Sequence, residues 1–115
     1  MLNNLHIPIL LSNAASWFWN TALLPNYPNP FNPETWIPYQ LAESANVTIR
    51  IYSADGQLIR TLLLGQQAAG LYQHRSRAAF WNGKNDVGEK VASGLYFYQL
   101  QADNMSLLRK MVILK

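Results

Sequence analysis

A strict alternation of side-chain type near the middle of the chain constrains its fold most. From Val47 to Tyr52 every second residue is a β-branched aliphatic one, and the residues between them are Thr, Arg and Tyr. A period of two puts the two sets of side chains on opposite faces of a β-strand. Ser53-Ala54-Asp55-Gly56 then supplies a turn in which Gly56 can adopt positive φ, and Gln57–Leu64 again has strand composition. The pattern predicts a β-hairpin.

The rest of the second half of the chain has the same character. Leu95–Ala102 is rich in Tyr, Phe and Leu, Asp103-Asn104 is a turn signal, and Met105–Leu114 predicts the last strand. Shorter strands are predicted at Thr35–Leu41, Leu71–Ser76 and Ala78–Trp81. No helical period follows residue 34. Short strands separated by turn signals predict an all-β chain, an immunoglobulin- or fibronectin-III-like antiparallel β-sandwich of about seven strands.

Glycines and prolines divide this pattern. We expect Gly56, Gly83 and Gly88 to be structural turn residues. Residues 23–34 form a Pro/Asn-rich strap, predicted to be extended because proline fixes φ and lacks a backbone donor. Tyr27 and Phe31 are expected to pin the strap to a surface. The prolines of the strap are Pro25, Pro28, Pro30 and Pro33.

The expected organisation is thus a lead at 1–22, the strap at 23–34 and the sandwich at 35–115. The lead admits three interpretations: a signal peptide, a remnant of an upstream segment, or a short helix that packs Trp17, Phe18 and Trp19. No apolar run in the sequence is long enough to span a bilayer as a helix.

Composition limits the classes of function. The chain has no cysteine, which excludes a disulfide framework and a thiolate metal site. Its net charge is +3, but the cations are dispersed rather than gathered into a stripe. We therefore expect no nucleic-acid partner, whereas weak attraction to a surface polysaccharide is compatible with the charge.

The residues that could carry chemistry do not form a recognisable catalytic pattern. There are two histidines, His6 and His74, and most of the six carboxylates fall in predicted turns. We expect no enzyme activity and no catalytic residue. The best metal candidate is Asn82–Glu89, whose oxygen-rich side chains on a glycine-containing loop could hold calcium; a plain polar turn is the alternative, and no metal ligand is assigned.

A series of short motifs resembles one known family. The motifs, in chain order, are Leu24–Thr35, Val47–Gly56, Gln57–Leu64, Gly70–Tyr72, Trp81–Gly83, Asn85–Gly88, Ala92–Tyr98 and Lys110–Lys115. Together they resemble the type IX secretion, type A C-terminal sorting domains, also called Por secretion tails. That family is similar in fold to the immunoglobulin-like domain of the flagellar hook-capping protein. Two departures are Asn82, where the family usually has Asp, and a longer stretch between Tyr72 and Trp81.

The resemblance implies a non-catalytic sorting and anchoring module. Such a module directs an exported protein through the periplasm and the outer membrane to the cell surface or the medium. Its implied partners are the outer-membrane secretion machinery and a cargo fused at its N-terminus. The implied recognition residues are Gly94, Tyr96, Lys110 and Lys115, and the strap is expected near a linker or cleavage region.

Two further functions stay open at the level of sequence. A passive structural or adhesive module of a multidomain surface protein could use the same sandwich. A carbohydrate-binding module would need exposed, coplanar rings. The rings that decide this are Trp36, Tyr39, Trp81 and Tyr98.

Overall fold

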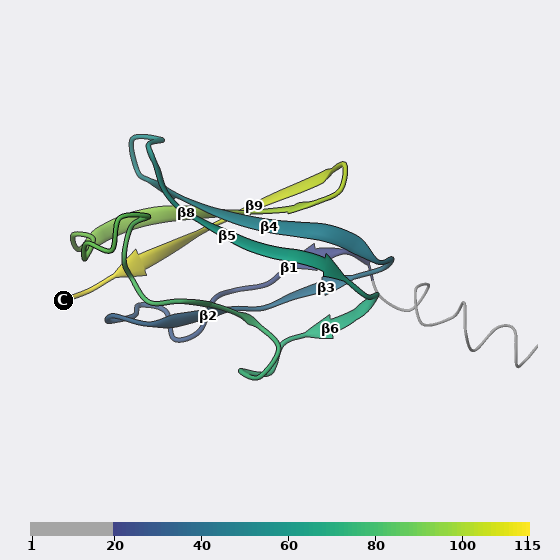
Figure 1. Cartoon of the computed structure of the whole chain (residues 1–115). Coiled ribbons are helices and arrows are strands. Elements are labelled where there is room, and N and C mark those ends of the chain that lie inside the picture. The colour runs from purple at the N-terminus through teal and green to yellow at the C-terminus, as the bar shows by residue number, and fades with distance from the viewer. Residues whose placement is uncertain (1–19) are drawn as a thin grey trace, which may run out of the picture.

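The computed structural model describes residues 20–115, and these contain nine β-strands (Figure 1). The strands are β1 (Ala22–Leu23), β2 (Thr35–Ile37), β3 (Tyr39–Leu41), β4 (Ala45–Ser53), β5 (Leu58–Gln67), β6 (Gly70–Tyr72), β7 (Ala79–Trp81), β8 (Gly94–Ala102) and β9 (Met105–Ile113). All strand pairs are antiparallel. The predicted immunoglobulin-like β-sandwich is confirmed, with two short strands more than expected.

The strands lie in two layers. The long strands form one sheet in the order β5-β4-β8-β9. The opposite layer consists of β1-β3-β6 and β2-β7, and Figure 1 shows it running beneath the long sheet. The prediction of one strand over Thr35–Leu41 is wrong, because Pro38 separates β2 from β3 and cannot donate to a ladder.

Two other strand boundaries differ from the prediction. β5 continues to Gln67, past Gly65, whose φ of +77° lies next to a register shift between Val47 and Thr48. The strand predicted to reach Ser76 ends at Tyr72. After it, the carbonyl of His74 accepts hydrogen bonds from the backbone N–H groups of residues 77 and 78, which closes a tight turn.

The core follows from the alternation in the sequence. Val47, Ile49 and Ile51 are fully buried, and so are Trp81 and Tyr98. Each buried aliphatic side chain contributes about 1.5–3 kcal/mol relative to an exposed one. Strand β8 buries Tyr96, Tyr98 and Leu100 on the same face, so the predicted core face of that strand is confirmed. Within residues 20–115 there is no long apolar helix of the kind that crosses a membrane.

Two tyrosines stack where β3 meets β6. The ring centroids of Tyr39 and Tyr72 lie 4.7 Å apart with an interplanar angle of 11°. Burial, together with the neighbouring Tyr72, raises the pKa of Tyr39 to about 12. Arg77 nearby acts in the opposite direction on this pKa. The fold therefore favours the neutral phenol of Tyr39.

This shift predicts an alkaline limit on stability. Because the folded-state pKa of Tyr39 lies above the unfolded value of 10.0, its contribution is complete below pH 10 and is lost as the pH rises toward about 12. We expect Tyr39→Phe to reduce the fall in the free energy of unfolding over that pH range, measured by urea denaturation at several pH values. An equal fall in the variant would contradict this assignment.

Candidate functional site

The C-terminal segment Lys110–Lys115 comprises the end of edge strand β9 and the two residues that follow it. Met111 and Ile113 are buried, whereas Lys110, Leu114 and Lys115 are exposed. The segment therefore fixes itself to the core through alternate residues and displays the others.

The strap binds this segment on the side away from β8. The backbone N–H of Phe31 donates to the carbonyl of Val112 at 3.1 Å, and the N–H of Leu114 donates to the carbonyl of Phe31 at 3.1 Å. The Oδ1 of Asn29 accepts from the N–H of Val112 at 3.0 Å. The strap thus pairs in parallel with the chain end, centred on Phe31 and Ile113.

The two aromatic residues of the strap behave differently. Tyr27 is half-buried, and its hydroxyl donates to the carbonyl of Gln73, as expected of a residue that pins the strap to a surface. Phe31 instead enters the core: it is 2% exposed, and its ring meets Trp81 edge-on at 5.7 Å. Tyr27 thus contacts the surface of the sandwich, whereas Phe31 is anchored in its core.

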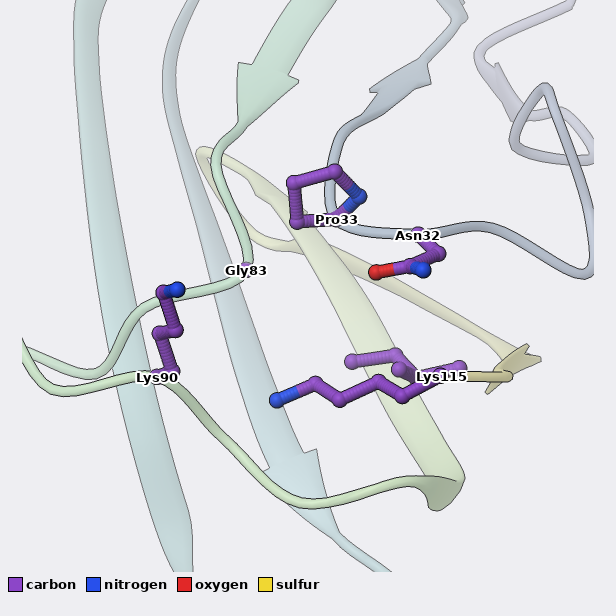
Figure 2. Close-up of a pocket in the computed structure, with 6 residues that line it drawn as sticks. Asn32, Pro33, Gly83, Lys90 and Lys115 are labelled. Atoms are coloured by element: carbon purple, nitrogen blue, oxygen red, sulfur yellow. The ribbon is translucent and has the colours of Figure 1, made fainter.

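A pocket lies where the strap, the turn after β7 and the chain end meet (Figure 2). It has a volume of about 170 Å³. Its lining residues are Asn32, Pro33, Gly83, Lys90, Ile113 and Lys115. We call it the C-terminal pocket. Three motifs that are far apart in the sequence therefore form one local structure.

Lys115 is held at this pocket by its backbone and its side chain. Its N–H donates to the Oγ of Ser93 at 3.2 Å, and its ammonium group donates to the carbonyl of Val91. In Figure 2 the Lys115 side chain extends across the pocket toward the segment that carries Lys90. The last residue of the chain is thus ordered by neighbours from the turn.

Of the other predicted recognition residues, Gly94 and Tyr96 lie on β8 and Lys110 lies on β9, and they differ in exposure. Gly94 pairs with Ile113, and its φ of +148° favours glycine. Tyr96 pairs with Met111 and is buried; its hydroxyl donates to the carbonyl of Ala92 at 2.8 Å, and burial raises its pKa. Lys110 lies outside the pocket, next to Phe97 and Leu108. The structure therefore brings Gly94 and Tyr96 next to the chain end, and it separates Lys110 from Lys115.

Comparison with models of known protein families identifies the family of this fold. The model of the FlgD Ig-like domain matches residues 32–106. The chain belongs to the FlgD Ig-like domain family. No curated protein matches this FlgD Ig-like domain.

Solved structures share its fold. FlgD from P. aeruginosa is 28% identical, with a TM-score of 0.50, over 64% of this chain. Dimeric latent PorU from Porphyromonas gingivalis is 18% identical, with a TM-score of 0.61, over 80% of the chain. PorZ from P. gingivalis, described as an essential surface component of the type-IX secretion system, is 18% identical, with a TM-score of 0.53, over 90%. The match to this chain covers 9% of the PorU chain, 56% of the FlgD chain and 12% of the PorZ chain.

Side-chain oxygen atoms of the loop proposed for calcium accept hydrogen bonds from the loop itself and from strand β5. The Oδ1 of Asn85 accepts from the N–H groups of Val87 and Glu89 at 3.1 and 2.9 Å. Asp86 accepts from the N–H of Thr61 at 3.1 Å and lies 3.6 Å from the Arg60 guanidinium. In the part of the chain that the structure describes, no three His, Cys, Asp or Glu residues gather as a metal site would need. The geometry is that of a polar turn.

Gly56, Gly83 and Gly88, which the sequence predicts to be turn residues, all have positive φ. Gly56 and Gly88 have φ of +88° and +87°, and a Cβ added at either position would meet nothing within 4 Å. Gly83 has φ of +77°, but a Cβ there would lie 2.4 Å from the carbonyl oxygen of Pro33. Only at Gly83 does the absence of a side chain also allow two segments to approach, namely the turn and the strap.

The condition for a carbohydrate platform is not met by the four rings named from sequence. Tyr39, Trp81 and Tyr98 are at most 2% exposed. Trp36 is half-buried, and the Arg75 guanidinium lies over its ring at 4.4 Å from the centroid. Sugar stacking on Tyr39, Trp81 or Tyr98 would require the core to open.

One strap residue with a structural role escaped the sequence reasoning. Asn26 is 3% exposed, and its N–H donates to the Tyr98 hydroxyl at 2.9 Å. That hydroxyl donates in turn to the carbonyl of Leu24 at 2.8 Å. The Nδ2 of Asn26 donates to the Oγ1 of Thr35 at 3.0 Å. The alternation of asparagines with prolines in the strap was the available signal, because an asparagine among prolines can supply the donors that prolines lack.

Proposed function

We propose that this domain is a non-catalytic sorting and anchoring module that directs an exported protein through the outer membrane to the cell surface. It would pass through the periplasm, be read by the outer-membrane secretion machinery and carry a cargo fused at its N-terminus. Gly94, Tyr96, Lys110 and Lys115 would form or support the recognised surface.

The observation that carries the proposal is the backbone pairing of the strap with the chain end. A folded signal can be read by a receptor when its backbone is ordered and its side chains are accessible. The pairing of Phe31 with Val112 and Leu114 orders the segment, while Lys110 and Lys115 stay exposed. Tyr96 would act as a positioning residue, because its buried ring packs at 6.1 Å from Trp81 beneath the chain end.

The similarity to PorU and PorZ supports the same role at the level of fold. Both proteins come from Porphyromonas gingivalis, and PorZ is described as part of the type-IX secretion system. A domain of this fold is therefore present in PorZ, a component of that secretion system.

A passive structural or adhesive module is the second candidate. Leu108 on edge strand β9 is 61% exposed, and exposed edges can pair with another chain. In that role the domain would stay joined to its neighbour and would not depend on the export machinery.

An export assay separates the two candidates. A periplasm-directed reporter is fused to residues 20–115, because β1 begins at Ala22 and would be lost from a shorter fusion. We expect the fusion, and not the reporter alone, to reach the surface or medium of a host with type IX machinery, and to stay in the periplasm of the same host without it. Periplasmic retention of an intact, folded fusion in both hosts would favour the structural module.

A further inference from the structure

A cluster of aromatic and basic side chains lies on the outer face of the β2-β7 pair. Trp36 and Phe80 are directly opposed across these strands, and their neighbours along each strand are buried. Trp36 and Phe80 therefore point away from the core. Their ring centroids lie 5.3 Å apart, and Tyr27 adds a third ring 6.3 Å from Trp36. We call these rings, with Arg75, the Trp36 patch.

The loop at residues 73–78 completes the patch. The hydroxyl of Tyr27 donates to the carbonyl of Gln73, and the Arg75 guanidinium stacks over Trp36 at 4.4 Å. The loop is thereby docked on the rings, and Phe80 is left 42% exposed.

The charge of the patch is unbalanced. An open pocket of about 500 Å³ beside it is lined by Tyr27, Pro28, Gln73, His74 and Arg75, with no acidic residue. The ion pair found within residues 20–115 joins Arg60 to Asp86, so Arg75 has no carboxylate partner in the described chain. A guanidinium stacked on a ring keeps its N–H groups free at its edge, where they fit a carboxylate in bidentate geometry.

We propose that the Trp36 patch docks an acidic segment of a partner protein. A carboxylate of that segment would pair with Arg75, and an adjacent apolar side chain would cover Phe80. Trp, Tyr and Arg are the residues that contribute most to protein–protein binding. This inference does not depend on the sorting role.

Other occupants fit less well. The rings of the patch are tilted by 44° and 50° to one another, and Arg75 covers one face of Trp36, so a flat sugar platform is not formed. A second copy of the chain would bring the same net charge of +3 and only six acidic residues. The chemistry of the patch therefore favours a different, acidic partner.

The test is an NMR titration of the ¹⁵N-labelled full chain with a short synthetic peptide of alternating glutamate and leucine. We expect shifts centred on the Trp36 indole and the backbone of residues 73–80, and weaker binding at higher salt. Arg75→Gln should weaken binding about fivefold, which is about 1 kcal/mol. Arg50→Gln is the matched control, because it removes the same charge from a residue on β4. The Arg50 guanidinium donates a hydrogen bond to Gln101 there.

Each alternative has its own outcome. Equal binding of a glutamine–leucine peptide would overturn the proposal, because no carboxylate would then be needed. Equal displacement of the glutamate–leucine peptide by polyphosphate or by an anionic polysaccharide would overturn the assignment to a protein segment, because the patch would then be a general anion site. Shifts centred on Lys110–Lys115, or equal losses in Arg75→Gln and Arg50→Gln, would also overturn it. A dispersed spectrum of each free variant establishes that it is folded.

Discussion

Replacing Gly83 with alanine is expected to lower the free energy of unfolding by about 2–4 kcal/mol. Two costs add at this position. The φ of +77° is one that alanine rarely adopts, and the new Cβ would lie 2.4 Å from the carbonyl oxygen of Pro33. Because the strap backbone would have to move away, the loss should also loosen the C-terminal pocket. Urea denaturation followed by tryptophan fluorescence measures the change.

Gly56→Ala is the matched control for this prediction. Gly56 has a similar φ of +88°, but an added Cβ would have no neighbour within 4 Å. Gly56→Ala should lower the free energy of unfolding only through the strained backbone conformation, by about 1 kcal/mol. If the two variants were equally stable, the close approach of the turn to the strap would not matter to the fold.

Phe31→Ala is expected to cost about 3–5 kcal/mol, because it removes a buried aromatic ring that packs on Trp81. Its second effect should be local. The amide hydrogens of Val112 and Leu114 depend on the strap for their partners, so their exchange with solvent should accelerate more than that of Ile49 in the central strand β4.

Phe31→Leu tests the origin of this effect. Leucine keeps much of the apolar volume, so we expect a smaller loss of stability and near-normal protection of Val112 and Leu114. Uniform acceleration of all amides in Phe31→Ala would indicate that the strap and the chain end are not a separate unit.

The period-two alternation was enough to predict the layers of the sandwich. Val47–Tyr52 can satisfy its alternation only as a strand with one face in a core, and the turn glycines fix where the chain reverses. Tyr96 and Tyr98 were correctly assigned to the inner face for the same reason. Local pattern determines these features, so the sequence contains the required information.

The candidate site depends on contacts between distant segments, and these were not predictable from local pattern. Nothing in the composition of the strap indicates that Phe31 would pair with Ile113, which lies more than half the chain away. The break at Pro38 could have been predicted, since proline cannot donate to a strand ladder. The signals at residues 1–22 lie almost entirely outside the described residues.

The central claim is that the exposed lysines of the chain end are read by the export machinery. The most direct measurement is surface delivery of the reporter fused to residues 20–115, with and without Lys110→Gln and Lys115→Gln together. Deleting Lys110–Lys115 would be less informative, because it also removes the buried Met111 and Ile113. We predict that the double variant keeps its fold, as judged by protease resistance, and is delivered at least about tenfold less, equivalent to about 1.4 kcal/mol in recognition. Delivery equal to that of the unchanged fusion would contradict the claim.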